Sequence, residues 1–215
     1  MRLKICGVTN IKQAQAITDF GVDTIGFICV RKSPRYVSPS AINEIIKQLP
    51  PEISTIGVFV NETIENITQI VNETGLTGVQ LHGEETPQFC SSLREIFPEI
   101  EIIKAIRYKD SGARQEAEIY LPVVDTLLID TYQKDVYGGT GKTFPWSQMS
   151  DFRPSRPWLL AGGVGADNVV EAFETLTCDG LDISSSVEIS PGQKDLTKIK
   201  ELLGILESIK NKLPV

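Results

Sequence analysis

The stretch Lys4-Ile5-Cys6-Gly7-Val8-Thr9 decides how the chain begins to fold. An apolar run from Leu3 to Ile5, interrupted only by Lys4, is typical of a β-strand that ends at Cys6. A glycine follows directly, and Thr9-Asn10 precedes a segment with helical spacing of its apolar residues, Ile11, Ala14, Ile17 and Phe20. The stretch therefore predicts a strand, a tight turn and a helix N-cap. The Cys6 thiol at the strand end is either a reachable functional group or a small core filler.

The same pattern of strand followed by helix recurs along the chain. Seven further apolar runs predict strands at Val22–Val30, Ile53–Val60, Thr77–Leu81, Glu101–Ile106, Thr126–Ile129, Trp158–Ala161 and Leu181–Ile183. Helical stripes are expected after Ser38-Pro39, from Asn61, after Thr86-Pro87, through about Leu121, over Val169–Leu176 and over Ile199–Ile209. The sixth run is followed instead by a long loop that holds Gly138-Gly139-Thr140-Gly141.

Eight such units without a low-complexity linker indicate a parallel sheet that is covered by helices on its outer face. Eight units close naturally into a (β/α)₈ TIM barrel, and we expect residues 1–215 to form one such domain. A doubly wound open sheet is the alternative. It is disfavoured because no G-x-G-x-x-G sequence follows the first strand.

Composition excludes several classes of partner. A net charge of −7 argues against a surface for nucleic acid or anionic membrane. The chain has no apolar run of the roughly 18 residues that a membrane helix needs, and Met1 to Lys4 leads straight into a strand, so we expect no secretory signal. The scattered cysteines Cys6, Cys29, Cys90 and Cys178 form no CxxC pair, which favours a reduced, cytoplasmic compartment.

Polar or small residues end the apolar runs. In a (β/α)₈ barrel the carboxyl ends of the strands build the active site, and polar groups there are costly unless they converge on a ligand. The residues at these ends are Cys6, Arg31 and Lys32 leading to Arg35, Asn61, His82, Arg107, Asp130, Gly162-Gly163 and Ser184-Ser185-Ser186. We therefore expect a ligand site among them.

The last two strand ends predict a phosphate site. Loops after strands seven and eight of such barrels often bind phosphate with backbone N–H groups and a helix N-terminus. Gly162-Gly163-Val164-Gly165 lets the backbone approach a ligand closely, and Ser184 and Ser185 add hydroxyl donors. The alternative is a pair of ordinary glycine and serine turns.

Cys6 and Asp130 are the candidates for proton transfer. Asp130 closes the apolar run Leu127-Leu128-Ile129, where partial desolvation would raise its pKa and suit it as a general acid. The alternative for Asp130 is a cap or a structural ion pair. Cys6 is suited to act as a base where neighbouring cations favour its thiolate.

Two further residues are candidates for contact with a ligand. His82 is the only histidine, so a metal site with several histidines is excluded, and the residue is either a catalyst or a hydrogen-bonding wall. Arg35, beside Ser33-Pro34, is placed to hold a carboxylate through two hydrogen bonds. The alternative for Arg35 is a solvated surface position.

The segment that ends in Gly141-Lys142-Thr143 resembles a nucleotide-binding P-loop only superficially. That motif needs glycine where Val136 stands, and it must join a strand directly to a helix. We therefore expect a flexible lid or binding loop here.

Taken in order, several motifs resemble those of the phosphoribosylanthranilate isomerase family over essentially the whole chain. They are Lys4-Ile5-Cys6-Gly7-Val8-Thr9, Ser33-Pro34-Arg35-Tyr36-Val37-Ser38-Pro39, Gly57-Val58-Phe59-Val60-Asn61, Val79-Gln80-Leu81-His82-Gly83, Leu128-Ile129-Asp130-Thr131, Gly138-Gly139-Thr140-Gly141-Lys142-Thr143-Phe144, Ala161-Gly162-Gly163 and Asp182-Ile183-Ser184-Ser185. Each motif alone is weak, but their order and spacing together are specific.

The resemblance implies a (β/α)₈ barrel that performs an Amadori rearrangement of a phosphorylated small molecule in tryptophan biosynthesis, with no cofactor. It implies Asp130 as general acid, Cys6 as general base and Arg35 on the anthranilate carboxylate, with Gly163, Ser184 and Ser185 holding the phosphate. His82 is counted among the substrate-binding residues. The chain departs from the family pattern at Ser186, where glycine is usual, and at Pro145, where aspartate is usual.

Three alternatives compete with this interpretation. Indole-glycerol-phosphate synthase uses lysine and glutamate pairs at strand ends, and Cys6 does not fit that pattern. Ribulose-phosphate epimerase needs a metal cluster, which one histidine disfavours. A non-catalytic barrel that binds a phosphometabolite would need neither an acid nor a base, so Cys6 and Asp130 argue against it.

Overall fold

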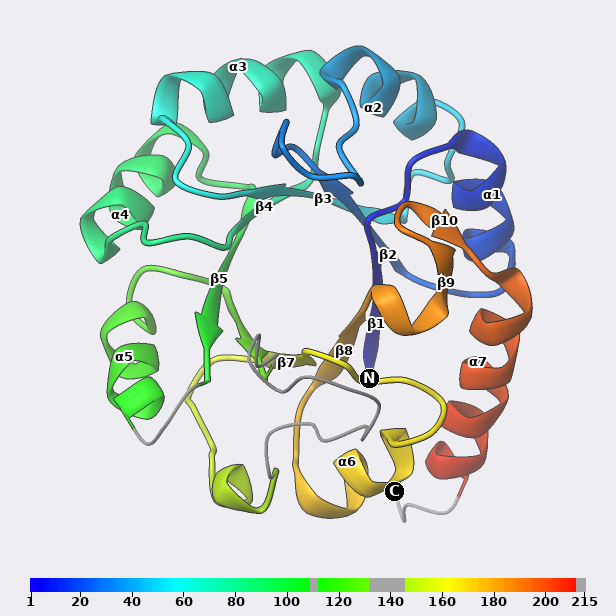
Figure 1. The fold of residues 1–215 in the computed structure, drawn as a ribbon. Helices are drawn as coiled ribbons and strands as arrows, with labels where there is room; N and C mark the ends of the chain where they lie inside the picture. The colour runs from blue at the N-terminus through cyan, green and yellow to red at the C-terminus, as the bar shows by residue number, and fades with distance from the viewer. Residues whose placement is uncertain (109–111, 132–145, 212–215) are drawn as a thin grey trace.

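The computed structural model describes residues 1–108, 112–131 and 146–211. Eight parallel strands form a closed barrel in chain order, and helices surround it (Figure 1). The strands are β1 (Arg2–Cys6), β2 (Thr24–Ile28), β3 (Ser54–Phe59), β4 (Gly78–Leu81), β5 (Glu101–Arg107), β6 (Thr126–Asp130), β7 (Trp158–Ala161) and β8 (Gly180–Ile183). Pairing of β1 with both β2 and β8 closes the ring, which confirms the predicted TIM barrel and excludes an open sheet.

The helices within the described ranges are α1 (Ile11–Asp19), α2 (Pro39–Ile46), α3 (Ile64–Thr74), α4 (Pro87–Ile96), α5 (Gly112–Tyr120), α6 (Val169–Thr175) and α7 (Leu196–Lys210). After β6 the described residues contain only a 3₁₀ helix, η1 (Trp146–Met149), so the sixth unit has no α-helix there. After β8 come a second 3₁₀ helix, η2 (Ser185–Val187), and a hairpin of β9 (Glu188–Ser190) and β10 (Gln193–Lys194). The predicted loop over Gly138 to Thr143 and the family departure at Pro145 lie outside the described residues.

Side-chain caps explain where the helices begin. Asn10, Ser38 and Thr86 each accept a hydrogen bond from the backbone N–H three residues on, as the sequence predicts. The prediction that the helix after β3 starts at Asn61 is wrong. Asn61 has a left-handed φ of 50°, and Thr63 is the N-cap of α3. The chain therefore turns once more after β3 before the helix begins.

The apolar core has two parts. One small cluster fills the barrel interior between β3 and β7, with Ile56, Ile103, Ala105, Leu128, Leu159 and Ala161. The larger cluster lies between the barrel wall and the helices. Among the described residues, no helix is both long and apolar enough to cross a membrane.

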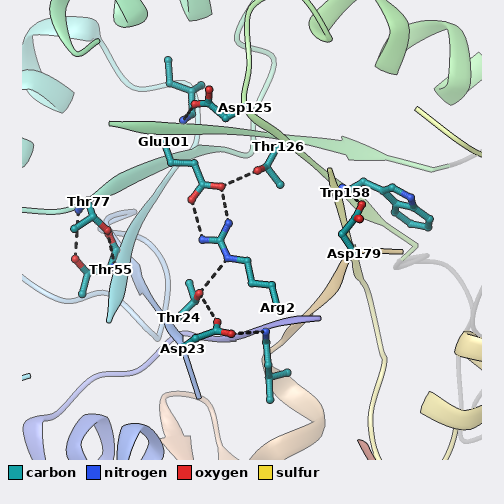
Figure 2. A network of polar contacts seen from close by, with 12 residues as sticks. Arg2, Asp23, Thr24, Thr55, Thr77, Glu101, Asp125, Thr126, Trp158 and Asp179 are labelled. Carbon is teal, nitrogen blue, oxygen red and sulfur yellow. Dashed lines mark hydrogen bonds and ion pairs between the residues drawn. The ribbon is translucent and has the colours of Figure 1, made fainter. Parts of the chain in front are cut away.

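A polar network closes the amino-terminal end of the barrel (Figure 2). Arg2 on β1 reaches Glu101 on β5 with two hydrogen bonds, Nη1 to Oε1 at 2.5 Å and Nη2 to Oε2 at 2.8 Å. Thr24 on β2 accepts from Arg2 Nε at 3.1 Å, and Thr126 on β6 donates to Glu101 at 2.7 Å. Because four strands are joined there, the opposite end of the barrel is the one that remains open for a ligand.

Candidate active site

A cavity of about 260 Å³ lies at the carboxyl ends of the strands. Its lining includes the seven residues to which the sequence assigns a role in catalysis or substrate binding: Cys6, Arg35, His82, Asp130, Gly163, Ser184 and Ser185. Ile28, Ser33, Val58, Gln80, Ala161, Gly162, Val164, Asp182 and Ser186 complete the wall. Residues separated by as many as 180 positions thus converge on one pocket, because the barrel brings every strand end to the same face.

Other residues at strand ends do not reach this cavity. Arg31, Lys32 and Asn61 are exposed and absent from its lining. Arg107 lines a neighbouring cavity of about 210 Å³, which shares only His82 with the first. A position at the end of a strand is therefore not sufficient to predict that a residue lines the cavity.

Cys6 lies at the end of β1 with 5% of its surface exposed, above a buried ion pair. Lys4, two residues earlier on the same side of the strand, donates to Asp182 on β8 at 2.9 Å. Burial raises the pKa of the Cys6 thiol; the positive charge of Lys4 opposes this effect, the negative charge of Asp182 adds to it, and the net shift is upward. A neighbouring cation, Lys4, is therefore present, but its charge does not outweigh the effect of burial.

Asp130 belongs to a chain of three polar side chains across β4 and β6. His82 Nε2 lies 3.2 Å from Asp130 Oδ2, and Gln80 Nε2 lies 2.9 Å from His82 Nδ1. With the Gln80 amide nitrogen as donor, Nδ1 is the acceptor, so the ring proton is on Nε2 and points at Asp130. The Asp130 side chain is 19% exposed, so its carboxyl is partly desolvated but open to the cavity.

The loop that carries His82 is held from beneath by Glu85. This buried carboxylate accepts from the backbone N–H groups of Asn61 at 2.8 Å and Gly83 at 2.9 Å, and from Lys104 Nζ at 2.9 Å. Burial raises the pKa of Glu85, but the hydrogen bonds and charge of Lys104 outweigh it and hold that pKa below its usual value. Glu85 thus joins the loops after β3 and β4 into one support for His82.

Arg35 makes a forked ion pair with Glu188 at the start of β9. Arg35 Nη2 donates to Glu188 Oε2 at 2.6 Å, and Nε donates to Oε1 at 2.9 Å. Lys194 Nζ on β10 donates to the same Oε1 at 2.9 Å. Burial raises the pKa of Glu188, yet the hydrogen bonds from Arg35 and Lys194 prevail and lower it. Arg35 is therefore at the cavity wall, as expected, but it is fixed by a partner that the sequence analysis did not identify.

The loops after β7 and β8 lie side by side because these strands pair. Gly162 and Gly163 have φ values of 90° and 79°, a left-handed conformation that favours glycine. Ser184 Oγ donates to the carbonyl of Cys6 at 3.1 Å, and Ser186 Oγ donates to that of Val164 at 2.6 Å. The segment after Ser184 is the three-residue η2 rather than an α-helix, so the dipole of a long helix does not support this loop.

The sequence analysis missed five polar residues around the site: Lys4, Gln80, Asp182, Glu188 and Lys194. All are buried. Lys4, Gln80 and Asp182 each interrupt a predicted apolar strand, which is the local signal that the sequence offers for them. Glu188 and Lys194 lie beyond the eighth predicted strand and are recognisable only through their contacts with each other and with Arg35.

Comparison with known proteins gives a consistent result. Residues 3–204 match the family model described as N-(5'phosphoribosyl)anthranilate (PRA) isomerase. A protein of Gloeothece citriformis named N-(5'-phosphoribosyl)anthranilate isomerase is 52% identical over 202 residues, which are 94% of this chain and 92% of the relative. Another of the same name from Nostoc punctiforme is 50% identical, over 97% of this chain and 99% of its own.

Solved structures agree with these relatives. The phosphoribosyl anthranilate isomerase of Thermotoga maritima superimposes with a TM-score of 0.88 and 37% identity, over 97% of this chain and 99% of that one. A second structure of such an isomerase, in complex with reduced 1-(o-carboxyphenylamino)-1-deoxyribulose 5-phosphate, has a TM-score of 0.85 at 34% identity, over 97% and 99% of the two chains.

Proposed function

The chain belongs to the N-(5'-phosphoribosyl)anthranilate isomerase family, an enzyme family of tryptophan biosynthesis, and from this premise we propose how its residues perform the reaction. The proposal assigns Asp130 as general acid and Cys6 as general base in the Amadori rearrangement. The substrate is N-(5-phosphoribosyl)anthranilate, the product is the 1-amino-1-deoxyribulose phosphate isomer, and the reaction takes place in the cytoplasm without a cofactor.

Two anchors orient the substrate across the cavity. Arg35 faces the anthranilate carboxylate with the guanidinium edge that Glu188 does not occupy. The backbone N–H groups around Gly163, with the N–H and hydroxyl groups of Ser184 and Ser185, bind the phosphate. His82 forms the wall between these anchors. The ribose then lies between β1 and β6, within reach of both proton-transfer groups.

Asp130 opens the ring. Its carboxyl proton passes to the furanose oxygen while the bond from that oxygen to C1 breaks, and the lone pair of the anthranilate nitrogen forms C1=N. The product of this step is a protonated Schiff base and an Asp130 carboxylate. The His82 Nε2–H, 3.2 Å from Asp130 Oδ2, stabilises the carboxylate that forms.

Cys6 completes the rearrangement. Its thiolate takes the proton from C2, and the electrons of the C2–H bond form C1=C2 as the C1=N pair returns to nitrogen. The enolamine then tautomerises to the ketone, with a proton lost from the C2 hydroxyl and a proton gained at C1. The positive charge of Lys4, buried beside Cys6, favours the thiolate that this step needs.

The observation that carries this proposal is the convergence of all seven residues on one cavity, with Cys6 and Asp130 on strands separated by β7 and β8. A barrel that only bound the ligand would need the two anchors but no titratable group between them.

The test is turnover by Cys6→Ala and Asp130→Asn, followed by the decay of anthranilate fluorescence. Each variant should lose at least about 10²-fold in kcat while its circular dichroism stays unchanged. Cys178→Ala is the matched control, because this free cysteine lies outside the cavity lining and should behave as the parent. Near-normal kcat for either Cys6→Ala or Asp130→Asn would refute the assignment of that residue.

A further inference from the structure

Glu188 is a carboxylate beside the cavity that accepts hydrogen bonds from three residues, although it does not line the cavity itself. It receives hydrogen bonds from Arg35 Nε and Nη2, from Lys194 Nζ at 2.9 Å and from the Gly192 N–H at 3.1 Å. The Glu188 side chain is 4% exposed and that of Lys194 is 0% exposed, whereas Arg35 keeps 24%. The carboxylate is therefore fixed by the protein, and only the arginine reaches solvent and ligand.

The aliphatic part of Arg35 is fixed as well. Gly7, which follows Cys6, has a φ of 77°, and a Cβ built there would lie 2.8 Å from Arg35 Cδ. The same point lies 3.5 Å from Ser184 Oγ and 3.6 Å from Lys194 Nζ. Arg35 therefore passes over Gly7 at closest packing and enters the cavity from one direction.

The group that holds Arg35 also contacts the loop after β8. Lys194 Nζ donates to the Ser184 carbonyl at 3.2 Å, and Ser184 Oγ donates to the Cys6 carbonyl at 3.1 Å. Thr9 Oγ1 donates to the Gly192 carbonyl at 2.6 Å, which ties the β9–β10 hairpin to the turn after β1, beside which it lies in Figure 1. A fixed path of hydrogen bonds thus joins the arginine to the turn that carries the thiol.

We propose that Glu188 is a positioning residue that sets the direction of Arg35 toward the substrate carboxylate, with Lys194 balancing its charge. The inference rests on the proposed role of Arg35. Glu188 occupies the Nε–Nη2 edge of the guanidinium, and Nη1 makes no hydrogen bond to the described residues. Arg35 and Lys194 together carry two positive charges against one negative charge, so the group keeps a net charge of +1 for an anionic ligand.

The charge of Glu188 and its proposed positioning role predict opposite effects of Glu188→Gln on the binding of an anionic ligand. By Coulomb's law alone, removal of a negative charge beside an anion site tightens binding of the anion. If Glu188 positions Arg35, the variant loses the fork and the guanidinium can turn away, so binding of a carboxylated ligand weakens. Loss of one hydrogen bond to a charged group corresponds to roughly 10- to 150-fold in Kd.

The probes are reduced 1-(o-carboxyphenylamino)-1-deoxyribulose 5-phosphate and its counterpart without the carboxylate, with Kd measured by titration calorimetry. Glu188→Gln should weaken the carboxylated probe by at least about 10-fold and change the other by less than about 3-fold. In an Arg35→Ala background the same substitution should not weaken the carboxylated probe further, because a positioning residue acts only through its partner. The matched control is Lys198→Ala, which removes a contact with the Glu188 backbone carbonyl at 3.1 Å and should leave both values unchanged.

Tighter binding of the carboxylated probe by Glu188→Gln, or equal weakening of both probes, would overturn the inference. If Glu188→Gln does not fold, Glu188→Asp takes its place, since it keeps the charge but withdraws the carboxylate by one methylene and should show the same selective loss. The role of Arg35 itself would be refuted by a different result, in which Arg35→Ala weakens the binding of both probes equally. The two failures are therefore distinguishable.

Discussion

The buried pair of Lys104 and Glu85 allows a quantitative prediction for Lys104→Met. The two side chains are 1% and 2% exposed, and Lys104 Nζ also donates to the carbonyl of Gly83 at 2.7 Å. Methionine has nearly the same length, so the substitution removes the charge with little change in volume. Breaking a buried pair by removing one partner costs about 3–5 kcal/mol, because the other charge is left without compensation. With an m-value of about 2 kcal/mol/M in urea, the unfolding midpoint should fall by roughly 1.5–2.5 M near pH 7.5.

The loss should depend on pH. In the parent, the folded-state pKa of Glu85 lies below the value of the unfolded chain, so its contribution to stability is present above the unfolded pKa and is lost as pH falls through the folded pKa. In Lys104→Met the buried carboxyl has no cation, and its folded-state pKa rises above the unfolded one. The difference in midpoint between the parent and Lys104→Met should therefore shrink as pH is lowered from 7.5 to 5.

Two controls isolate the uncompensated charge as the cause. Adding Glu85→Gln to Lys104→Met should restore much of the midpoint, since it removes the charge but keeps an acceptor for the backbone N–H groups. Arg114→Ala, which breaks an exposed pair with Asp151, should leave the midpoint nearly unchanged. A loss for Lys104→Met that is independent of pH and unaffected by Glu85→Gln would refute this reasoning.

Three further predictions concern single positions. Because burial raises the pKa of the Cys6 thiol, kcat/KM should increase with pH beyond neutrality, in parallel with the rate at which iodoacetamide alkylates Cys6. A rise in kcat/KM that is already complete well below pH 7 would contradict this prediction. Gly204→Ala, at an exposed position of α7, should stabilise the fold by about 0.5–1 kcal/mol in urea titrations, since no atom outside the backbone of the helix itself lies within 4 Å of the added Cβ. Gly165→Ala should weaken inhibition by inorganic phosphate, because the added Cβ would lie 2.8 Å from the Cβ of Ser186. Adding Ser186→Gly should restore the inhibition. If the double variant is not inhibited, the contact between these two positions does not shape the loop.

Much of the barrel is predictable because its signals are local. Asn10, Ser38 and Thr86 predict the starts of three helices, because each accepts a hydrogen bond from the backbone N–H only three residues further on. The apolar run Val22–Val30 predicts a strand over that whole range, but β2 covers only Thr24–Ile28, where its pairing with β3 ends. Apolar runs therefore predict the position of a strand well but its last residue poorly, since pairing with the neighbouring strand sets that residue.

The residues of the site are predictable only where a side chain capable of proton transfer or ligand binding lies at the end of a strand. Cys6 and Asp130 interrupt apolar sequence at places that a barrel makes functional, so they are visible from the sequence alone. Glu188 is not visible, because it lies beyond the last predicted strand and its partner Arg35 is 153 positions away. Position along the strand misleads as well: Arg107 ends β5 and Asn61 follows β3, yet neither lines the cavity. A single sequence contains the residues of such networks but not their pairing.

The ion pair beneath Cys6 has a consequence for how the chain is made. Lys4 and Asp182 are 178 positions apart, and β1 completes its pairing only when β8 is present. A ribosome that adds roughly 5–20 residues per second needs about 9–36 s to synthesise the interval between them. Throughout that time the lysine lacks its carboxylate partner, and burying its charge alone would be unfavourable. Of the eight strands, β1 is thus synthesised first but gains its second neighbour only with β8, and closure of the ring waits for the synthesis of that strand.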